Sequence, residues 1–170
     1  MKKWLLGLFM IFTVSAAFSQ RFAYVDTKYI LNNIPAYKAA QEKLNQLSFE
    51  WQQELESKQE NIDELFQEYQ NEKVLLSDKM KQQRKQQIDQ QRKELNDLKR
   101  KYFGPEGELY KKRQELVRPI QEEVYSVIEQ MADKGNYAVI FDAADKANML
   151  YTDPQYDKSD EVLKELGYKK

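Results

Sequence analysis

The stretch LNQLSFEWQQELESKQENIDELFQEYQNEKVLL, residues 44–76, decides the fold because its apolar side chains recur every seven residues. Two positions of the repeat hold ten residues, seven of them apolar: Leu44, Trp51, Lys58, Leu65 and Glu72 at one, and Ser48, Leu55, Ile62, Tyr69 and Leu76 at the other. This spacing is typical of a helix that packs on a second helix along one narrow seam. Residues 36–76 lack glycine and proline and predict one helix of about 60 Å.

The segment that follows predicts a sharp reversal and a return helix. Ser77 or Asp78 can cap that helix by accepting hydrogen bonds from its first backbone N–H groups. Residues 36–76 carry four Lys and nine Asp or Glu, net −5, while residues 78–101 carry nine Lys or Arg and four Asp or Glu, net +5. Opposite charges favour antiparallel pairing, although each exposed ion pair contributes well under about 1 kcal/mol. We expect the turn near residues 76–79.

The return helix keeps its seven-residue phase across an interruption, YFGPEGELY, at residues 102–110. The apolar positions in phase are Ile88, Leu95, Tyr102, Leu109 and Leu116. A loop that ended a domain would have no reason to keep this phase. Pro105 lacks a backbone donor and costs a helix about 3 kcal/mol, while Gly104 and Gly107 relax the backbone around it. We therefore expect one helical hairpin over residues 36–135, with a kink at these three residues.

The start of the return helix, KMKQQRKQQIDQQRK at residues 79–93, is polar where a packed helix should be apolar. A solvated helix face explains this pattern without any function. Alternatively, the cations form a basic tip that meets an acidic or membrane-associated partner. The residues that would make this contact are Lys79, Lys81, Arg84 and Lys85.

Residues 1–19 have the features of a cleaved secretory signal. Two lysines precede an apolar run of about fifteen residues, and small side chains at Ala17 and Ser19 precede Gln20. The run is shorter than the roughly twenty residues of a membrane-spanning helix. We therefore expect export from the cytoplasm after cleavage between Ser19 and Gln20.

Composition excludes several functional classes. The formal charge of −1 becomes −3 when Lys2 and Lys3 leave with the signal, which is not the balance of a nucleic-acid-binding protein. Without cysteine there are no disulfides, thiol nucleophiles or thiolate metal sites, and without histidine there is no imidazole base or His-ligated zinc. An enzyme using only carboxylates would need a rigid concave pocket. The sequence predicts no such pocket, so we expect neither enzymatic activity nor a cofactor.

Residues 20–35 and 136–170 are expected to form a small α/β body. The segments RFAYVD at 21–26, YAVIFD at 137–142 and NMLYT at 148–152 predict strands, and SDEVLKELG at 159–167 predicts a closing helix. A body of about fifty residues is marginal alone, so association between copies through these strands is expected. The strand residues expected at this contact are Phe22, Tyr24, Val139, Phe141 and Leu150.

Two other patterns allow a functional and a structural interpretation. Residues 142–157 space four aspartates without the alternation, central glycine and final glutamate of an EF-hand, so turn and cap roles explain them better. Aromatic residues on the seam are expected to be core. Phe49, Phe66 and Phe103 lie just off the seam and could form a binding surface.

Together these segments resemble the Skp/OmpH family of periplasmic holdase chaperones. The resemblance covers the whole exported chain, from FAYVD at 22–26 and YILNNIPAYKAAQEKL at 29–44 to the closing helix. It is most specific in RQELVRPIQEEVYSVIEQMADKGNYAVIFDAADKANMLY, residues 113–151, and weakest in the arms, where any coiled coil looks similar.

The resemblance implies a homotrimer, in which strands of three chains build a small body and helical hairpins surround a cavity. Family members hold unfolded outer-membrane β-barrel proteins there, in the periplasm and without ATP, until insertion. The tip cations match the family's basic tips, and some members are proposed to bind lipopolysaccharide through basic residues of the arms. The acidic first arm departs from the pattern and leaves client preference open. The alternative is a coiled-coil spacer or adaptor that docks one envelope partner.

Overall fold

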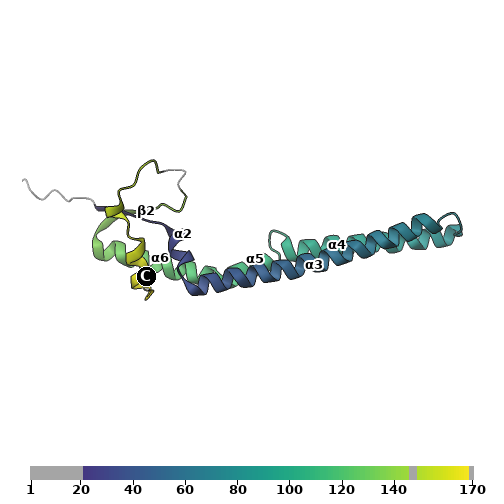
Figure 1. Ribbon diagram of the computed structural model, residues 1–170, viewed down its shortest axis with the longest axis horizontal. Helices are drawn as coiled ribbons and strands as arrows, with labels where there is room; N and C mark the ends of the chain where they lie inside the picture. Colours follow the sequence, from purple (N-terminus) through teal and green to yellow (C-terminus); the bar gives the residue numbers. More distant parts are fainter. Residues whose placement is uncertain (1–20, 146–148, 169–170) are drawn as a thin grey trace, which may run out of the picture. The chain divides into compact units, whose positions relative to one another are not determined.

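The computed structural model describes residues 21–145 and 149–168 of the 170-residue chain. Its elements are β1 (Arg21–Val25), α2 (Thr27–Asn32), α3 (Pro35–Glu72), α4 (Asp78–Phe103), α5 (Glu108–Leu116), α6 (Arg118–Gly135), β2 (Tyr137–Asp142), the 3-10 turn η2 (Pro154–Tyr156) and α7 (Ser159–Glu165). The predicted signal and its cleavage point lie outside the described residues. Long paired helices and one two-stranded sheet confirm the predicted fold class, mainly helical with a small β body and a helical hairpin (Figure 1).

The chain divides into two compact units. The unit that we call the body contains the described residues up to Ile30 and those from Val124 on, and the arm is Leu31–Glu123. The predicted division placed all residues to 135 in the arm. The second half of α6 belongs to the body, where its Val127 and Met131 line a small pocket together with Tyr137 of β2 and Glu161 of α7.

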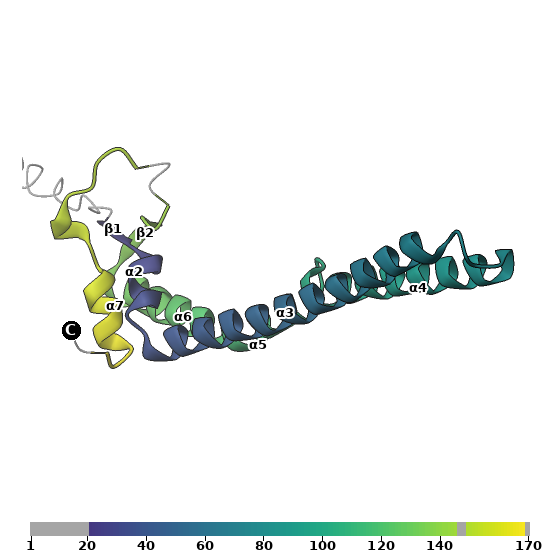
Figure 2. The same ribbon diagram turned by 45° about the vertical axis from the view of Figure 1, so that its right-hand side comes forward.

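One narrow apolar seam holds the arm together. Its buried side chains are Leu55, Ile62 and Tyr69 of α3 and Ile88 and Leu95 of α4. All five stand at positions of the seven-residue repeats, and Figures 1 and 2 both show α3 lying alongside α4 and then α5. A second cluster of Ala40, Leu44 and Val117 continues the seam. Each large apolar side chain buried in this way contributes about 1.5–3 kcal/mol.

The chain reverses over residues 73–77, slightly before the predicted turn. Helix α3 ends at Glu72, and Ser77 is the residue that caps α4, its hydroxyl accepting a 3.4 Å hydrogen bond from the backbone N–H of Met80. Ser77 has the extended backbone angles of a capping residue, and α4 begins directly after it at Asp78. The residues that reverse the chain direction therefore lie before Ser77. The turn therefore precedes the cap instead of following it.

The opposite charges of the two helices do not form direct bridges between them. In the described part of the chain, every ion pair within 4.0 Å joins side chains three or four residues apart, as Lys81 and Asp78 do at 3.3 Å. The expected attraction between the two helices is therefore not expressed as ion pairs. Exposed charges at longer range are screened by salt, so the seam supplies most of the pairing energy.

An aromatic cluster joins α3 to the end of α4. The rings of Trp51 and Tyr102 stack with centroids 4.7 Å apart and planes 5° apart, and Phe103 meets Trp51 edge-on at 6.2 Å. The Tyr102 hydroxyl donates a 2.8 Å hydrogen bond to Oε2 of Glu54. That hydrogen bond is the main cause that raises the pKa of Tyr102, with desolvation and the Glu54 charge adding to it. The ring stacking and the hydrogen bond both join α3 to the C-terminal end of α4.

The segment GPEG at 104–107 interrupts the return helix without ending the arm. Helix α4 stops at Phe103 and α5 starts at Glu108, so the chain forms two helices rather than one bent helix. The backbone folds tightly here, because the N–H of Gly107 donates a 2.9 Å hydrogen bond to the carbonyl of Gly104. A Cβ atom on Gly104 would lie 2.4 Å from the Arg100 carbonyl oxygen, so only glycine fits.

A second, smaller interruption follows at Val117. Helix α5 ends at Leu116 and α6 begins at Arg118, because Pro119 disfavours helical geometry in the residues before it and removes one backbone donor. Val117 is nevertheless buried in the second seam cluster. The interruptions at both prolines thus leave the packed face of the arm in place.

The body is built on a parallel pair of strands. Phe22, Ala23, Tyr24 and Val25 pair in that order with Val139, Ile140, Phe141 and Asp142, after a register shift between Arg21 and Phe22 that leaves Ala138 unpaired. Ala23 and Val25 are buried on one face, and the alternating residues point to the other. The predicted strand NMLYT is wrong for its described residues 149–152, which are irregular. The second edge of β1 instead pairs once, between Tyr24 and Asp157.

A buried hydroxyl connects the two ends of the body. Ser159 at the start of α7 accepts a 2.8 Å hydrogen bond from the N–H of Asp26 and donates one of 2.6 Å to Oδ1 of Asp157. Asp26 in turn accepts from the N–H of Tyr29 at 2.8 Å and caps α2. The chain leaving β1 is thereby fixed to the chain entering α7, 133 residues later.

We predict that Gly104→Ala destabilises the arm by about 1–3 kcal/mol, because the added methyl group overlaps backbone that cannot move away freely. Denaturant unfolding followed by helical circular dichroism measures the change. Glu106→Ala, at an exposed position of the same segment, is the matched control and should leave the midpoint almost unchanged. Equal midpoints for the two variants would contradict the close packing at Gly104.

We also predict a pH dependence from Tyr102. The pKa of Tyr102 in the folded protein is raised above the ordinary 10.0, chiefly by its hydrogen bond to Glu54. The protonated hydroxyl therefore stabilises the fold fully below pH 10, and this contribution is lost as the pH rises through the raised pKa. In the chain from residue 20 on, Trp51 is the single tryptophan, and a stacked tyrosinate quenches it. The midpoint of quenching should fall in Glu54→Gln and not in Glu56→Gln. Identical midpoints in all three proteins would refute the assignment.

Candidate functional site

The arm tip, residues 73–85, combines cations with exposed apolar side chains. Lys79 and Lys85 are exposed and Arg84 is half-buried, and within the described residues none of the three has an ion-pair partner. Lys81 pairs with Asp78. The structure therefore brings the four predicted tip cations together in the first two turns of α4. Their contact with a client or membrane stays a prediction.

The apolar part of the tip was missed by sequence reasoning. Val74 and Leu75 are 80% and 86% exposed, and Met80 is 49% exposed. We expected α3 to run to residue 76, which would have hidden this stretch among ordinary helix positions. The signal that could have revealed it is the cap at Ser77, since the residues before a cap must form the turn.

The aromatic residues just off the seam differ from one another. Phe66 packs against the seam, and the Arg92 guanidinium lies over its ring, 5.3 Å from the centroid. Phe103 is held edge-on by Trp51. Phe49 is 59% exposed on α3. Only Phe49 is thus free of a packing role among these three, while Tyr110 on α5 is a further exposed aromatic side chain.

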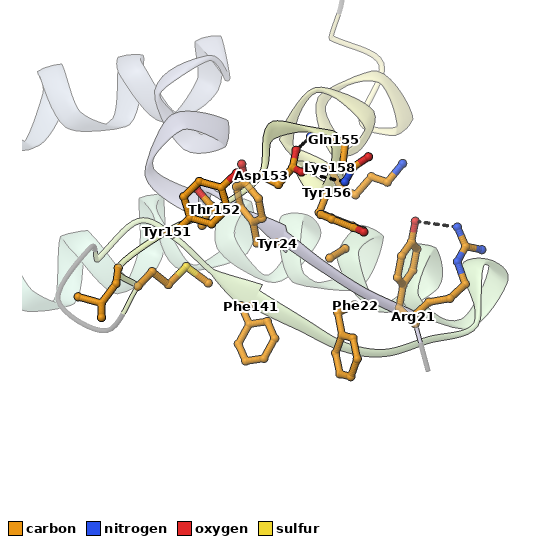
Figure 3. Close-up of a pocket in the computed structure, with 14 residues that line it drawn as sticks. Arg21, Phe22, Tyr24, Phe141, Tyr151, Thr152, Asp153, Gln155, Tyr156 and Lys158 are labelled. Atoms are coloured by element: carbon orange, nitrogen blue, oxygen red, sulfur yellow. Dashed lines mark hydrogen bonds between the residues drawn. The ribbon is translucent and has the colours of Figure 1, made fainter. Parts of the chain in front are cut away.

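The outer face of the sheet is apolar and open. Phe22 and Phe141 are 47% and 48% exposed, and Figure 3 shows both rings extending on the same side of the strands. Val139, the partner of Phe22 in the sheet, is also exposed. Tyr24 is half-buried. Leu150 is fully exposed in the irregular segment, so it reaches this region from a loop and not from the predicted strand.

A groove of about 900 Å³ lies beside these strands in the body. Its lining includes Phe22, Tyr24, Phe141, Tyr151, Tyr156 and Lys158 (Figure 3). The ammonium of Lys158 bonds Oε2 of Glu161 at 2.8 Å. That hydrogen bond raises the pKa of Lys158, against partial burial that lowers it. The groove offers aromatic surface and two cations, Lys158 and Arg21, whose guanidinium lies over the Tyr137 ring, 4.7 Å from its centroid. Such a surface is suited to packing against another polypeptide.

Three of the four aspartates of residues 142–157 accept hydrogen bonds in turns and at the starts of helices. Asp142 accepts from the hydroxyl of Thr27 at 2.7 Å and from the N–H of Ala144 at 2.9 Å, and Asp153 accepts from the N–H of Gln155 at 3.1 Å. Asp157 binds Ser159. In the described residues, no group of three acidic, His or Cys side chains could hold a metal ion. Among these same residues, no helix is long and apolar enough to cross a membrane.

Comparisons with known proteins agree with this architecture. A family model described as outer membrane protein (OmpH-like) matches residues 21–166. The chain is 30% identical to an uncharacterized protein of Aquifex aeolicus (strain VF5) over 166 aligned residues. The alignment covers 98% of this chain and 96% of that protein.

A crystal structure of an OmpH-like protein from Caulobacter crescentus CB15, assigned as an outer membrane chaperone, has a similar fold. The match has a TM-score of 0.67 at 16% identity and covers 86% of this chain and 83% of the other. The family model spans both the arm and the body, including the stretch where the resemblance is most specific. The chain therefore belongs to the OmpH-like outer membrane protein family.

Proposed function

We propose that this protein is an ATP-independent holdase chaperone, which binds unfolded outer-membrane β-barrel proteins in the periplasm and keeps them soluble until insertion. Family membership supports a chaperone-type role. The observation that carries the finer proposal is the arm itself, which buries one thin seam and leaves most of its surface in water. A chaperone for many clients needs such a broad, adaptable surface more than it needs a shaped pocket.

The surface chemistry of the arm suits unfolded barrel proteins. Their strands alternate apolar and polar residues, so an unfolded segment presents both kinds of group at short intervals. The arm carries exposed aromatic side chains at Phe49 and Tyr110 among closely spaced charges of both signs. Each contact is weak, and many weak contacts on one chain give useful affinity without a unique binding pose.

The sequence also supports a mechanism without nucleotide. No glycine-rich phosphate-binding motif is present among its five glycines. Binding and release would then depend on competition between the arm and the client's own folding in the membrane. Residues 1–19, with the features of a secretory signal, would deliver the chain to the periplasm.

We further propose that the body assembles three copies of the chain. Phe22, Val139 and Phe141 form an exposed apolar face on a sheet of only two strands, which is marginal as an isolated unit. A second copy that covered this face would bury aromatic area worth several kcal/mol, about 25 cal/mol per Å². Three such arms around one space would surround a client.

The proposed activity predicts that micromolar protein, without ATP, suppresses aggregation of a urea-unfolded β-barrel protein diluted into buffer. Light scattering of the client at 360 nm measures this directly, and an equal concentration of an unrelated helical protein is the control. A pull-down from a periplasmic extract should yield many barrel proteins. No suppression of aggregation, or one stoichiometric folded partner in the pull-down, would favour the spacer or adaptor instead.

The proposed assembly predicts a trimer mass in multi-angle light scattering across micromolar concentrations. Phe22→Ser with Phe141→Ser should shift the mass toward a monomer, because both rings would leave the apolar face. Tyr125→Ser removes a comparably exposed aromatic ring from α6 and should leave the mass unchanged. A monomer in the unmodified protein, or equal behaviour of the two variants, would overturn the proposed interface.

A further inference from the structure

The two long helices of the arm carry opposite charges that the arm itself does not use. Helix α3 contains three Lys and nine Asp or Glu, net −6, and α4 contains nine Lys or Arg and four Asp or Glu, net +5. Figures 1 and 2 show these helices side by side, yet among the described residues no ion pair within 4.0 Å joins them. Most of these charges are therefore left to solvent or to a partner outside the arm.

The clearest part of the acidic pattern is a row of glutamates on α3. Positions 56, 60, 64, 68 and 72 are all glutamate and all exposed. Side chains four residues apart on a helix are neighbours, and like charges at that spacing destabilise the helix. Glu60 and Glu64 each lie two residues from the buried Ile62, which places them on the face of α3 opposite the seam. The row weakens the helix and adds nothing to the seam, which indicates a cationic partner outside the arm.

Helix α4 carries matching cations on its own outer face. Lys93 lies two residues from the buried Leu95, so it stands on the face of α4 opposite the seam. Arg100 follows seven residues farther along the same face. Both side chains are exposed, and neither has an ion-pair partner among the residues that the structure describes. The outer side of α3 is thus acidic, and the outer side of α4 is basic.

These two outer sides match in level along the arm as well as in charge. The rings of Trp51 and Tyr102 stack between α3 and α4. Nine residues from each of them toward the turn, Glu60 and Lys93 stand at one level on opposite sides of the arm. They cannot meet within one arm, because both helices lie between them. They can meet between two arms that lie side by side and point the same way.

A ring of copies supplies such pairs of arms. Each copy in a ring meets its two neighbours through two different surfaces, and these surfaces must complement each other. An arm with one acidic and one basic side meets this condition. A twofold axis along the arms would instead bring the same side of both copies together, acid against acid or base against base. The charge pattern therefore favours a ring of copies over a pair.

We propose that the arms of neighbouring copies dock side to side, with Glu56, Glu60 and Glu64 of one copy on Lys93 and Arg100 of the next. The proposal rests on the proposed assembly of three copies and adds the contact that holds their arms together. Each exposed ion pair is weak and is screened by salt, so the docked arms separate readily. A client would enter between separated arms and be enclosed when they dock again.

The test is pulsed electron spin resonance, which measures distances between spin labels on different copies. The chain from residue 20 on has no cysteine, so Leu75→Cys carries one label in the turn, outside both charged faces. At about 10 mM salt, where charges act over about 30 Å, we expect a short and narrow distance distribution. At about 1 M salt, where the screening length is about 3 Å, the distribution should broaden and shift to longer distances.

Charge-reversed variants identify the two faces. Glu60→Lys with Glu64→Lys, or Lys93→Glu with Arg100→Glu, should give the long and broad distribution already at low salt, because like charges then meet between copies. All four substitutions together restore complementary faces and should restore the short distance. Glu60→Gln with Glu64→Gln introduces no new repulsion and should give an intermediate shift. Helical circular dichroism should stay unchanged throughout, since these positions lie outside the seam.

A matched control separates the faces from a general effect of charge. Glu123→Lys with Glu129→Lys makes the same charge change at exposed positions of α6 and should leave the short distance in place. A distance that does not respond to salt, equal shifts in face and control variants, or no recovery when all four substitutions are combined would overturn the inference.

The same preparations distinguish this inference from the proposals on which it rests. A trimer that holds clients but shows no change of distance with salt overturns the docking of arms and leaves the holdase intact. A trimer whose arms dock but which does not suppress client aggregation overturns only the holdase. A monomer mass in light scattering overturns the docking together with the proposed assembly.

Discussion

The burial of one narrow stripe on each helix is the constraint on which the arm depends. Two helices that pack only on each other can hide one stripe apiece, and here that stripe is five buried side chains between α3 and α4. Every other residue of the pair must then be compatible with water. The acidic surface of α3, the basic surface of α4 and the scarcity of apolar residues outside the seam all follow from this geometry. A surface of this kind can meet many partners because none of it is committed to internal packing.

The arm was largely predictable because its packing has a simple period. The seven-residue count identified all five seam residues of α3 and α4, and Ser77 was one of the two residues expected to cap α4. The exposed pair Val74 and Leu75 was not, because a count of apolar residues does not tell a packed leucine from one in a turn. Charge composition likewise indicated attraction between the helices, but it could not show that, in the described residues, no ion pair within 4.0 Å joins α3 to α4.

The body was less predictable because its contacts join residues far apart in the chain. The strands at 21–25 and 137–142 were recognisable from their β-branched and aromatic residues, but nothing local shows that they pair in parallel. Residues 149–152 also contain an aromatic and a β-branched residue and are not a strand, and the edge of β1 away from β2 pairs only once, between Tyr24 and Asp157, among the described residues. Ser159 carries no motif at all, and its bond to Asp26 depends on the fold being complete.

The break at 104–107 preserves the phase of the seam, and this sets a rule for how such an arm can change its length. Leu95, Tyr102, Leu109 and Leu116 keep the seven-residue interval through the break. An insertion that respects the seam must therefore be a multiple of seven in α3, matched by an equal one in α4, and each step lengthens the arm by about 10.5 Å. Arm length in this architecture can change only in steps of this size, so a chaperone with such arms would adapt to larger partners in discrete increments rather than by gradual growth.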